Sequence, residues 1–150
     1  MIDVKTILAP MDFSETSVLA LDHAKALAEK FNAALHLLHV LPDPHAPAWA
    51  LFAAGIPIDQ LRVRWAQRAR RRLDALLTTE EHAALRVVTA TRVGYTFLEI
   101  IRYAETHEVD LIVLGSHGHG PVEHMLLGSV AERVVRRAPC PVLTVREDRP

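Results

Sequence analysis

Cysteine is almost absent from this chain of 150 residues, because Cys140 is the only one. A single cysteine excludes a disulfide within the chain and is typical of a reducing compartment. Long apolar runs are missing too, since no stretch of about 18 apolar residues could form a transmembrane helix. The first ten residues, MIDVKTILAP, lack the basic segment and long apolar core of a secretory signal. We therefore expect a soluble, cytoplasmic protein.

An excess of charge of either sign is also lacking. Lysine and arginine number 17, aspartate and glutamate number 18, and the formal net charge is −1. Such a balance creates no overall field to attract nucleic acid or an anionic membrane, so neither is expected as a partner. Half of the residues are hydrophobic, which is enough for a core. The length is usual for one compact domain, and residues 1–150 are predicted to form a single one.

Short apolar runs alternate with helical patterns along the chain. The runs that favour buried strands span residues 6–10, 34–40, 85–91, 110–115 and 141–145. Between them, Ser14 is a favourable N-cap for a first helix to Phe31, and Pro57 opens a second helix to about Leu77. This alternation indicates βαβ units, which build an open parallel α/β sheet with helices on both faces.

Two later helix starts have the spacing of a capping box. Thr96 with Glu99 predicts a helix that ends near residue 108, and Ser129 with Glu132 predicts a short helix to residue 137. The apolar stripe of the first helix in the chain is expected at Val18, Leu21, Ala24, Leu27 and Phe31.

The segment from residue 42 to about residue 60 has no clear period and is predicted to be an irregular loop. A loop of this length is uncommon in a compact domain, so we expect a flap over a ligand or a surface covered by a partner. The helix after it has six arginines within residues 62–72, mostly opposite Leu61, Trp65 and Leu73. That pattern favours a solvated face, with an acidic partner as the alternative. Residues 146–150 form a polar tail.

Glycine is scarce, and four of the six glycines lie in GSHGHGPVEHMLLGS, residues 115–129. This loop follows the apolar run LIVL and precedes a helix. In open parallel sheets, ligands bind beyond the carboxyl ends of strands, where the strand order reverses. Backbone N–H groups without a neighbouring Cβ, together with a helix N-terminus, favour phosphate. The loop is therefore a candidate phosphate site, although a tight turn without a ligand would also use glycine.

Two familiar phosphate loops do not match this one. A P-loop needs lysine before its serine, whereas Gly128 precedes Ser129 here. The dinucleotide fingerprint follows the first strand, and the spacing of Gly115, Gly118 and Gly120 is its reverse. The pattern that does occur is G-x-x-G, nine residues, and then G-S.

With its flanks, this motif resembles the universal stress protein family, and the complete set of glycines resembles its ATP-binding branch. The flanks are TILAPMDFSE at the first strand, DLIVLGSHGHG at the fourth and GSVAERVVRRAPCPVLTV at the end. The resemblance covers nearly the whole chain and is weakest in residues 42–60. It implies a Rossmann-like, five-stranded parallel sheet of order 3-2-1-4-5, similar to that of the adenine nucleotide alpha hydrolases.

The resemblance also implies a set of nucleotide-binding residues. Glycines and a serine of the motif would surround the phosphates and ribose, an aspartate would lie near the ribose, and a strand-two backbone would meet the adenine. The implied set is Pro10, Asp12, Val40, Gly115, Gly118, Gly128, Ser129 and Val130. Asp12 has a structural alternative, as a cap of the first helix together with Glu15.

The resulting hypothesis is an ATP-binding regulatory or stress-response protein that forms a homodimer through its last strand, Pro141 to Val145. Mg²⁺ could accompany ATP, and ADP or AMP could be the ligand in place of ATP. One alternative is a slow ATPase or nucleotidyl-transfer enzyme, but the sequence offers no lysine clamp or evident arginine finger. A nucleotide-free dimerisation module is the other alternative.

The remaining candidates for chemistry are weaker. His117, His119 and His124 could suggest a metal, but two histidines at i, i+2 on a loop favour solvent or phosphate contacts instead. His36 and His39 lie on opposite faces of a strand and are expected to have structural partners. The one cysteine is expected to be a packed residue without an activated thiolate.

Overall fold

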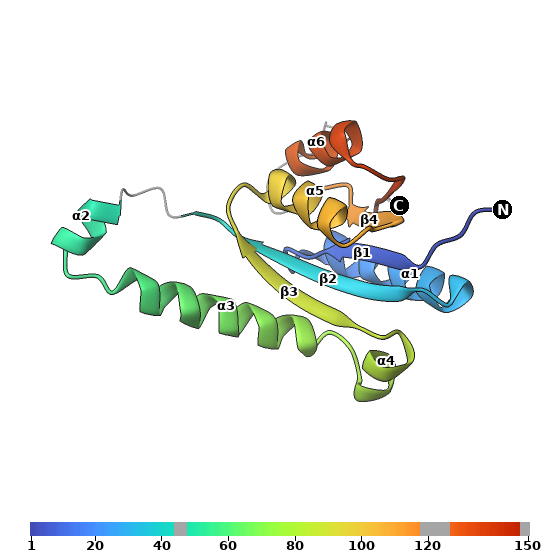
Figure 1. The fold of residues 1–150 in the computed structure, drawn as a ribbon, viewed down its shortest axis with the longest axis horizontal. Coiled ribbons are helices and arrows are strands. Elements are labelled where there is room, and N and C mark those ends of the chain that lie inside the picture. The colour runs from blue at the N-terminus through green and yellow to red at the C-terminus, as the bar shows by residue number, and fades with distance from the viewer. Residues whose placement is uncertain (44–47, 118–126, 148–150) are drawn as a thin grey trace.

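Five parallel strands form an open sheet in the computed structural model, which describes residues 1–43, 48–117 and 127–147 (Figure 1). The strands are β1 (Thr6–Pro10), β2 (Ala34–Leu41), β3 (Val88–Val93), β4 (Leu111–Gly115) and β5 (Val142–Val145). Their order is β3-β2-β1-β4-β5 and each neighbouring pair is parallel. The predicted fold class and strand order are confirmed.

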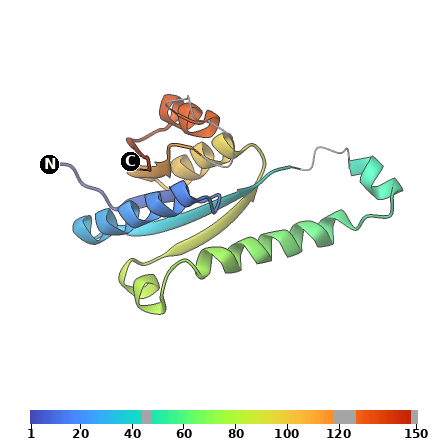
Figure 2. The ribbon, with the colours of Figure 1, turned by 180° about the vertical axis from the view of Figure 1, so that it is seen from behind.

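Helices cover both faces of this sheet. They are α1 (Glu15–Phe31), α2 (Ala48–Ala53), α3 (Ile58–Asp74), α4 (Thr79–Ala84), α5 (Thr96–Thr106) and α6 (Ser129–Arg137). In Figures 1 and 2, α5 and α6 lie on one face, whereas α1 and α3 lie on the other. No helix in the described ranges is both long and apolar enough to cross a membrane.

Two apolar cores result from this arrangement, one on each face. Ile7 and Ala9 of β1 belong to the core with α1 and α3, whereas Leu8 belongs to the core with α5 and α6. Successive side chains of a strand point to opposite faces, and all three of these residues are fully buried. The central strand is therefore apolar on both sides, as a parallel sheet between helical layers requires.

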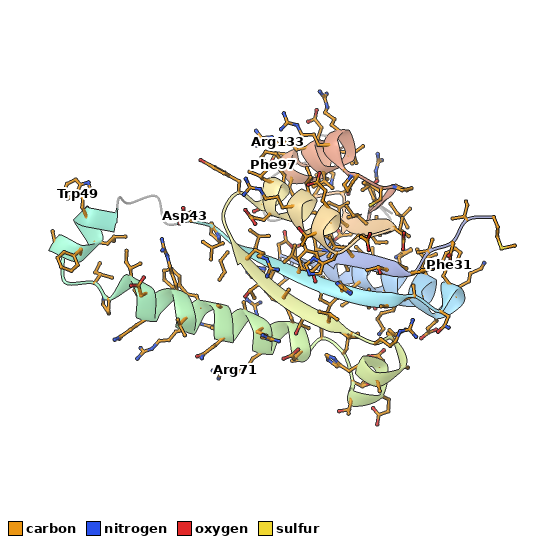
Figure 3. The ribbon with its side chains drawn as sticks, in the orientation of Figure 1. Phe31, Asp43, Trp49, Arg71, Phe97 and Arg133 are labelled. Atoms are coloured by element: carbon orange, nitrogen blue, oxygen red, sulfur yellow. The ribbon has the colours of Figure 1, made fainter. Side chains whose placement is uncertain are left out.

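The first helix begins where the sequence predicts, but its apolar stripe is narrower. Ser14 is the N-cap of α1, and its hydroxyl accepts a hydrogen bond from the Ser17 amide. Val18 and Phe31 are exposed, and Phe31 lies at the far end of α1 (Figure 3). The buried stripe is instead built mainly of small residues, Ala20, Leu21, Ala24 and Ala28. Alanine at i, i+4 and i+8 lets the helix lie close to the sheet.

Both predicted capping boxes are wrong. Thr96 and Ser129 are the first helical residues, and the N-caps of α5 and α6 are Tyr95 and Gly128, neither of which makes a side-chain cap hydrogen bond. The glutamates of the expected boxes pair with arginines along their own helices, Glu99 with Arg102 at 3.0 Å and Glu132 with Arg136 at 2.9 Å. In these ion pairs the carboxylates have arginine partners rather than the N-cap amides.

The real capping box lies in a helix that the sequence reading missed. The Thr78 hydroxyl accepts from the Glu81 amide at 3.1 Å, and the Glu81 carboxylate accepts from the Thr78 amide at 2.9 Å. This box starts α4, which occupies residues 79–84, so the third strand begins at Val88 rather than at residue 85.

The segment predicted to be irregular, residues 42–60, contains α2 and the start of α3. Only Ala69 and Leu73 of α3 are buried, near its carboxyl end. The amino-terminal part of α3 and all of α2 extend beyond the carboxyl ends of β2 and β3, whereas the carboxyl-terminal part of α3 lies alongside these strands (Figures 1 and 2). Trp65 is exposed for this reason, although the sequence assigns it to the apolar stripe.

Candidate functional site

A cavity of about 340 Å³ lies at the carboxyl edge of the sheet, beside the neighbouring strands β1 and β4. From β1 the chain continues into α1 on one face, and from β4 it leads towards α6 on the other. This divergence makes a crevice at the edge of an open sheet, where α/β proteins bind their ligands.

Seven of the eight residues implied by the sequence resemblance line this cavity. They are Pro10, Asp12, Val40, Gly115, Gly128, Ser129 and Val130. The eighth, Gly118, lies outside the described residues, as do His119 and His124. The fold thus brings the candidate nucleotide-binding residues of three separated segments of the chain to one cavity.

Apolar side chains form one wall of the cavity. Leu38 and Val40 of β2 stand on the same face of the sheet, and Ile100 of α5 and Leu114 of β4 complete the wall. Met11 also lines the cavity, and its amide donates to the Leu38 carbonyl at 2.8 Å. A flat, apolar group can pack against such a wall without leaving buried polar atoms unsatisfied.

Asp12 shapes the start of α1 without capping it. Its Oδ1 accepts from the Ser14 amide at 2.9 Å and from the Ser14 hydroxyl at 2.5 Å. The Ser14 hydroxyl in turn accepts from the Ser17 amide at 3.2 Å. The alternative in which Asp12 itself is the cap is therefore wrong, and the carboxylate orients the capping serine at the rim of the cavity.

The residue between them, Phe13, has a φ of 64°, in the left-handed region that a bulky residue rarely adopts. The Arg72 guanidinium lies 3.8 Å from the centre of the Phe13 ring, and the His39 ring lies 4.8 Å away on centroids. His39 is fixed by its Nδ1 contact with the Met11 carbonyl at 2.7 Å. These contacts hold a strained backbone beside the cavity, where strain commonly accompanies a binding loop.

The start of α6 is anchored by main-chain hydrogen bonds. The Gly128 amide donates to the Ser116 carbonyl at 2.6 Å, and the Ser116 amide donates to the Val145 carbonyl at 2.8 Å. No side chain caps α6, and its first residues, Ser129, Val130 and Ala131, line the cavity. The first turn of a helix has amides without intrahelical partners, so this turn offers hydrogen-bond donors to an anion.

A second helix without a side-chain cap starts at the same cavity. Thr96, the first residue of α5, lines it, as does Ile100 one turn later. The Arg133 guanidinium of α6 lies 5.0 Å from the centre of the Phe97 ring of α5, which holds the two helix starts together (Figure 3). Both helix dipoles therefore present their positive ends near one space.

Gly115 has a reason to be glycine that involves no ligand. A Cβ at this position would lie 2.9 Å from the Thr16 Cγ2 and 3.0 Å from the Thr16 main-chain carbon. The close approach of β4 to α1 excludes any side chain there. Gly128 differs, because its φ of −67° and ψ of 164° suit any residue. Backbone conformation therefore does not explain glycine at position 128.

His117 also lines the cavity and is oriented by its neighbour. Its Nδ1 lies 2.9 Å from the hydroxyl of Ser116, which is buried. The direction of this hydrogen bond depends on the tautomer of the ring. Among the described residues, no group of three or more histidine, cysteine, aspartate or glutamate side chains could hold a metal ion.

A cluster of titratable residues lies on the same face of the sheet, between β2 and α5. The His36 Nδ1 lies 2.9 Å from the Tyr103 hydroxyl, and the His107 ring stacks on the Tyr103 ring at 3.8 Å. Burial lowers the pKa of His36, and His107 lowers it further. Burial also raises the pKa of the Tyr103 hydroxyl. His36 and His39 thus have the structural partners that the sequence predicts.

Cys140 is half-buried beside the core under α5 and α6. Burial raises the pKa of its thiol, and the Asp110 carboxylate raises it further. A raised pKa disfavours the thiolate, which agrees with the predicted packing role.

Several lining residues were missed by sequence reasoning. Leu38, Ile100 and Ser116 carry no motif of their own. Leu38 could have been found from the strand period, since it shares a face with Val40 two residues later. Ile100 could have been found from the helix period, because it follows Thr96 by four residues.

The fold and the cavity define an α/β protein of the doubly wound class with a ligand-sized space at the edge of its sheet. The family model for the universal stress protein family matches residues 3–146. The chain therefore belongs to the universal stress protein family.

Individual relatives cover almost the same length. Universal stress protein MJ0577 of Methanocaldococcus jannaschii is 31% identical over 153 residues, covering 95% of this chain and 94% of the relative. Its solved structure has a TM-score of 0.82 and covers 99% of both chains. The universal stress protein UspA of Lactobacillus plantarum has a TM-score of 0.72 at 29% identity, over 95% of this chain and 98% of that one.

Another solved relative is a universal stress protein in complex with cAMP. It is 25% identical, has a TM-score of 0.65 and covers 97% of this chain and 99% of that one. A member of the family with a similar fold therefore binds an adenine nucleotide.

Proposed function

We propose that this protein binds an adenine nucleotide, with ATP as the main ligand, and acts as a nucleotide-dependent regulatory module in stress response. The observation that carries the proposal is the meeting of two helix starts without side-chain caps at a cavity lined by seven of the eight implied residues. The family relative in complex with cAMP supports the choice of an adenine nucleotide.

The adenine would lie against the apolar wall. Leu38, Val40 and Ile100 offer a surface on which an aromatic ring can pack. The polar edge of the base would meet the main chain at Val40, at the carboxyl end of β2. Asp12, at the rim, would accept a hydrogen bond from a ribose hydroxyl, since an ionised carboxylate is an acceptor only.

The phosphates would lie at the start of α6. The amides of Ser129 and Val130 can donate to phosphate oxygens, and the Ser129 hydroxyl makes no cap hydrogen bond that would compete. Gly128 keeps side-chain atoms away from this approach, and Gly118 would do the same in the part of the loop outside the described residues. Mg²⁺ would balance the phosphate charge, and ADP or AMP would use the same adenine wall.

Regulation requires that occupancy changes a surface that partners contact. We propose a cytoplasmic homodimer in which β5 and Pro141 pair with the same segment of a second copy. The strand lies at one edge of the sheet, and Leu143 within it is exposed. A strand at the edge of a sheet with an exposed leucine favours pairing with another strand. Leu143→Lys should convert a dimer to a monomer in light scattering, and an unchanged mass would contradict this interface.

The direct test of the ligand is mass spectrometry of small molecules released from freshly purified protein, followed by calorimetric titration with ATP. We expect an adenine nucleotide in the released fraction and saturable binding of ATP. A protein that releases no nucleotide and gives no heat with ATP, ADP, AMP or cAMP would overturn the proposal.

The regulatory role is distinguished from catalysis by phosphate release. A regulator binds ATP tightly and releases inorganic phosphate slowly or not at all. Steady release that His117→Ala abolishes while ATP still binds would show instead that this protein is an ATPase.

A further inference from the structure

The described part of the chain contains one long projection, which we call the arm: residues 48–72, comprising α2 and most of α3. Its outer part, α2 and the start of α3, extends beyond the sheet in both views of the ribbon, and its inner end lies alongside β3 (Figures 1 and 2). Within the arm, Ala69 is the single buried residue of α3. Leu73, the first residue after the arm, is also buried and completes the contact of α3 with the core. Most side chains of the arm are therefore exposed or half-buried.

The outer end of the arm, residues 49–58, is apolar and has no lysine or arginine. Trp49 is 74% exposed and Phe52, on the same face of α2, is 86% exposed. Ile56 adds a further exposed apolar side chain. Trp49 points away from the rest of the molecule at the end of the arm (Figure 3). Exposed large apolar side chains so close together in the chain favour a contact with another molecule or a membrane.

The inner part of the arm is strongly basic. Six arginines lie within residues 62–72, and Asp59 is the only carboxylate in the arm, which gives it a net charge of +5. The rest of the chain carries a net charge of −6. The near-zero net charge of the whole sequence is therefore the sum of a basic arm and an acidic remainder. The expectation that no anionic membrane is attracted rested on that overall balance, which the arm does not share.

Three of the arginines form an outer row on α3. Arg64, Arg68 and Arg71 recur at i, i+4 and i+7, which places them on one face of the helix. All three are exposed, and Arg71 points away from the sheet (Figure 3). Two other arginines already have partners in the molecule, Arg62 with Asp43 and Arg72 with a phenylalanine ring.

We infer that the arm docks onto an anionic lipid surface. Tryptophan and phenylalanine at its outer end would enter the headgroup region, as these side chains do on the apolar face of helices that lie at a membrane surface. The outer row of arginines would lie among the lipid phosphates, which attract basic side chains near the surface. From its interior outward, a lipid bilayer presents apolar tails and then anionic phosphates. The apolar end and the basic stem of the arm match these two layers in the same order.

Two other occupants fit the arm less well. Symmetric pairing of two arms would bring two charges of +5 together, which disfavours a second copy at this surface. Single-stranded nucleic acid is bound by aromatic side chains interleaved with basic ones. Here the aromatic end and the arginines are separated, apart from Trp65.

Tryptophan fluorescence tests the inference directly, because both tryptophans of the chain, Trp49 and Trp65, lie in the arm. The full-length protein is mixed with vesicles of phosphatidylcholine and phosphatidylglycerol, and separately with vesicles of phosphatidylcholine alone. We expect co-sedimentation and a shift of the emission to shorter wavelength with the anionic vesicles only, both reversed by high salt. In the Trp65→Phe variant the remaining Trp49 should show the larger shift.

Matched variants separate the arm from overall charge. Replacing Arg64, Arg68 and Arg71 with glutamine should weaken vesicle binding on the order of a hundredfold, at about tenfold or less per charge. The control carries three replacements with glutamine outside the arm, at Lys5, Lys30 and Arg136, and changes net charge equally. It should bind vesicles within a few-fold of the parent protein. Circular dichroism checks that each variant is folded.

Three outcomes would overturn the inference. In one, the emission and sedimentation are unchanged by anionic vesicles. In the second, the emission shifts with protein concentration and the mass doubles without lipid, which would identify a second copy as the occupant. In the third, a DNA oligonucleotide binds through the outer row of arginines while vesicles do not. None of these results bears on ATP binding, which is measured separately.

Discussion

Two helices start at the same edge of the sheet on opposite faces, and their first turns are satisfied differently. At α1 the chain supplies its own cap, because Ser14 accepts from the first turn and Asp12 holds Ser14 in place. At α6 the N-cap is Gly128, which has no side chain to offer. The contrast suggests a division of labour, in which α1 is a structural support and the start of α6 is kept open for an anion.

The largest expected effect comes from closing the open helix start. Gly128→Val is compatible with the φ and ψ of the residue, so the protein should stay folded, but its side chain would meet the approaching phosphate. Two hydrogen bonds to a charged group would be lost or lengthened, which should weaken ATP roughly a hundredfold. Calorimetric titration measures this effect, with Ser129→Ala as the variant that keeps the main chain accessible. Equal affinity in Gly128→Val and the parent would remove the role assigned to α6.

Gly115→Ala should act on stability first. The added Cβ would overlap both the side chain and the main chain of Thr16, and overpacking of this kind costs about 1–3 kcal/mol. For a domain of this size the melting temperature should fall by several degrees. Differential scanning calorimetry without ligand is the measurement. A melting temperature equal to that of the parent would mean that β4 does not need its close approach to α1.

Removing the cap of α1 should have a smaller effect. Ser14→Ala removes the acceptor for the Ser17 amide, at a cost of about 1 kcal/mol of folding free energy. Thr78→Ala is the matched control, since it removes a similar cap from α4, away from the cavity. Urea unfolding should give similar losses for both variants, with ATP affinity little changed. If Ser14→Ala weakened ATP as strongly as Gly128→Val, the proposed division of labour would be wrong.

The smallest effect concerns the stability of the protein at acidic pH, which depends on His36 between β2 and α5. The pKa of His36 lies below its ordinary value of 6.5 in the folded protein, mainly because the ring is buried. Well above pH 6.5 the His36 ring is neutral in both the folded and the unfolded chain, so its titration does not change the free energy of unfolding. As the pH falls below 6.5, the unfolded chain binds the proton more readily, so stability decreases. His36→Gln should flatten this decrease in urea unfolding, whereas the exposed His23→Gln should not. Identical pH profiles for the parent and His36→Gln would contradict the assignment.

Much of the fold was predictable from the sequence, because apolar period and length decide strands strongly. The apolar runs around Leu8 and Val113 are buried on both faces, and a run of that kind has few alternatives to a central parallel strand. Helix starts were harder to predict. Thr96 and Ser129 fit the capping-box pattern, but arginines one turn later along each helix compete for the same glutamates. Sequence spacing does not reveal which partner an exposed carboxylate takes.

The candidate site was predictable where it follows a motif and hidden where it follows packing. Asp12 and Gly128 could be named from their patterns, whereas Ser116 holds the start of α6 through its carbonyl, which any residue type possesses. The reason for glycine at position 115 could not be found either, since it depends on Thr16 from another element. Of the arm, α3 was predicted, whereas α2 was missed because a helix of six residues is too short for periodicity to identify.

The central claim is that main-chain amides at the start of α6 hold the phosphates of a nucleotide. A crystal structure of the protein with Mg·ATP tests it most directly. The account predicts phosphate oxygens within hydrogen-bond distance of the Ser129 and Val130 main-chain nitrogens, with the adenine packed beside Val40. Nucleotide bound elsewhere, or phosphates held only by side chains while these amides face solvent, would contradict it.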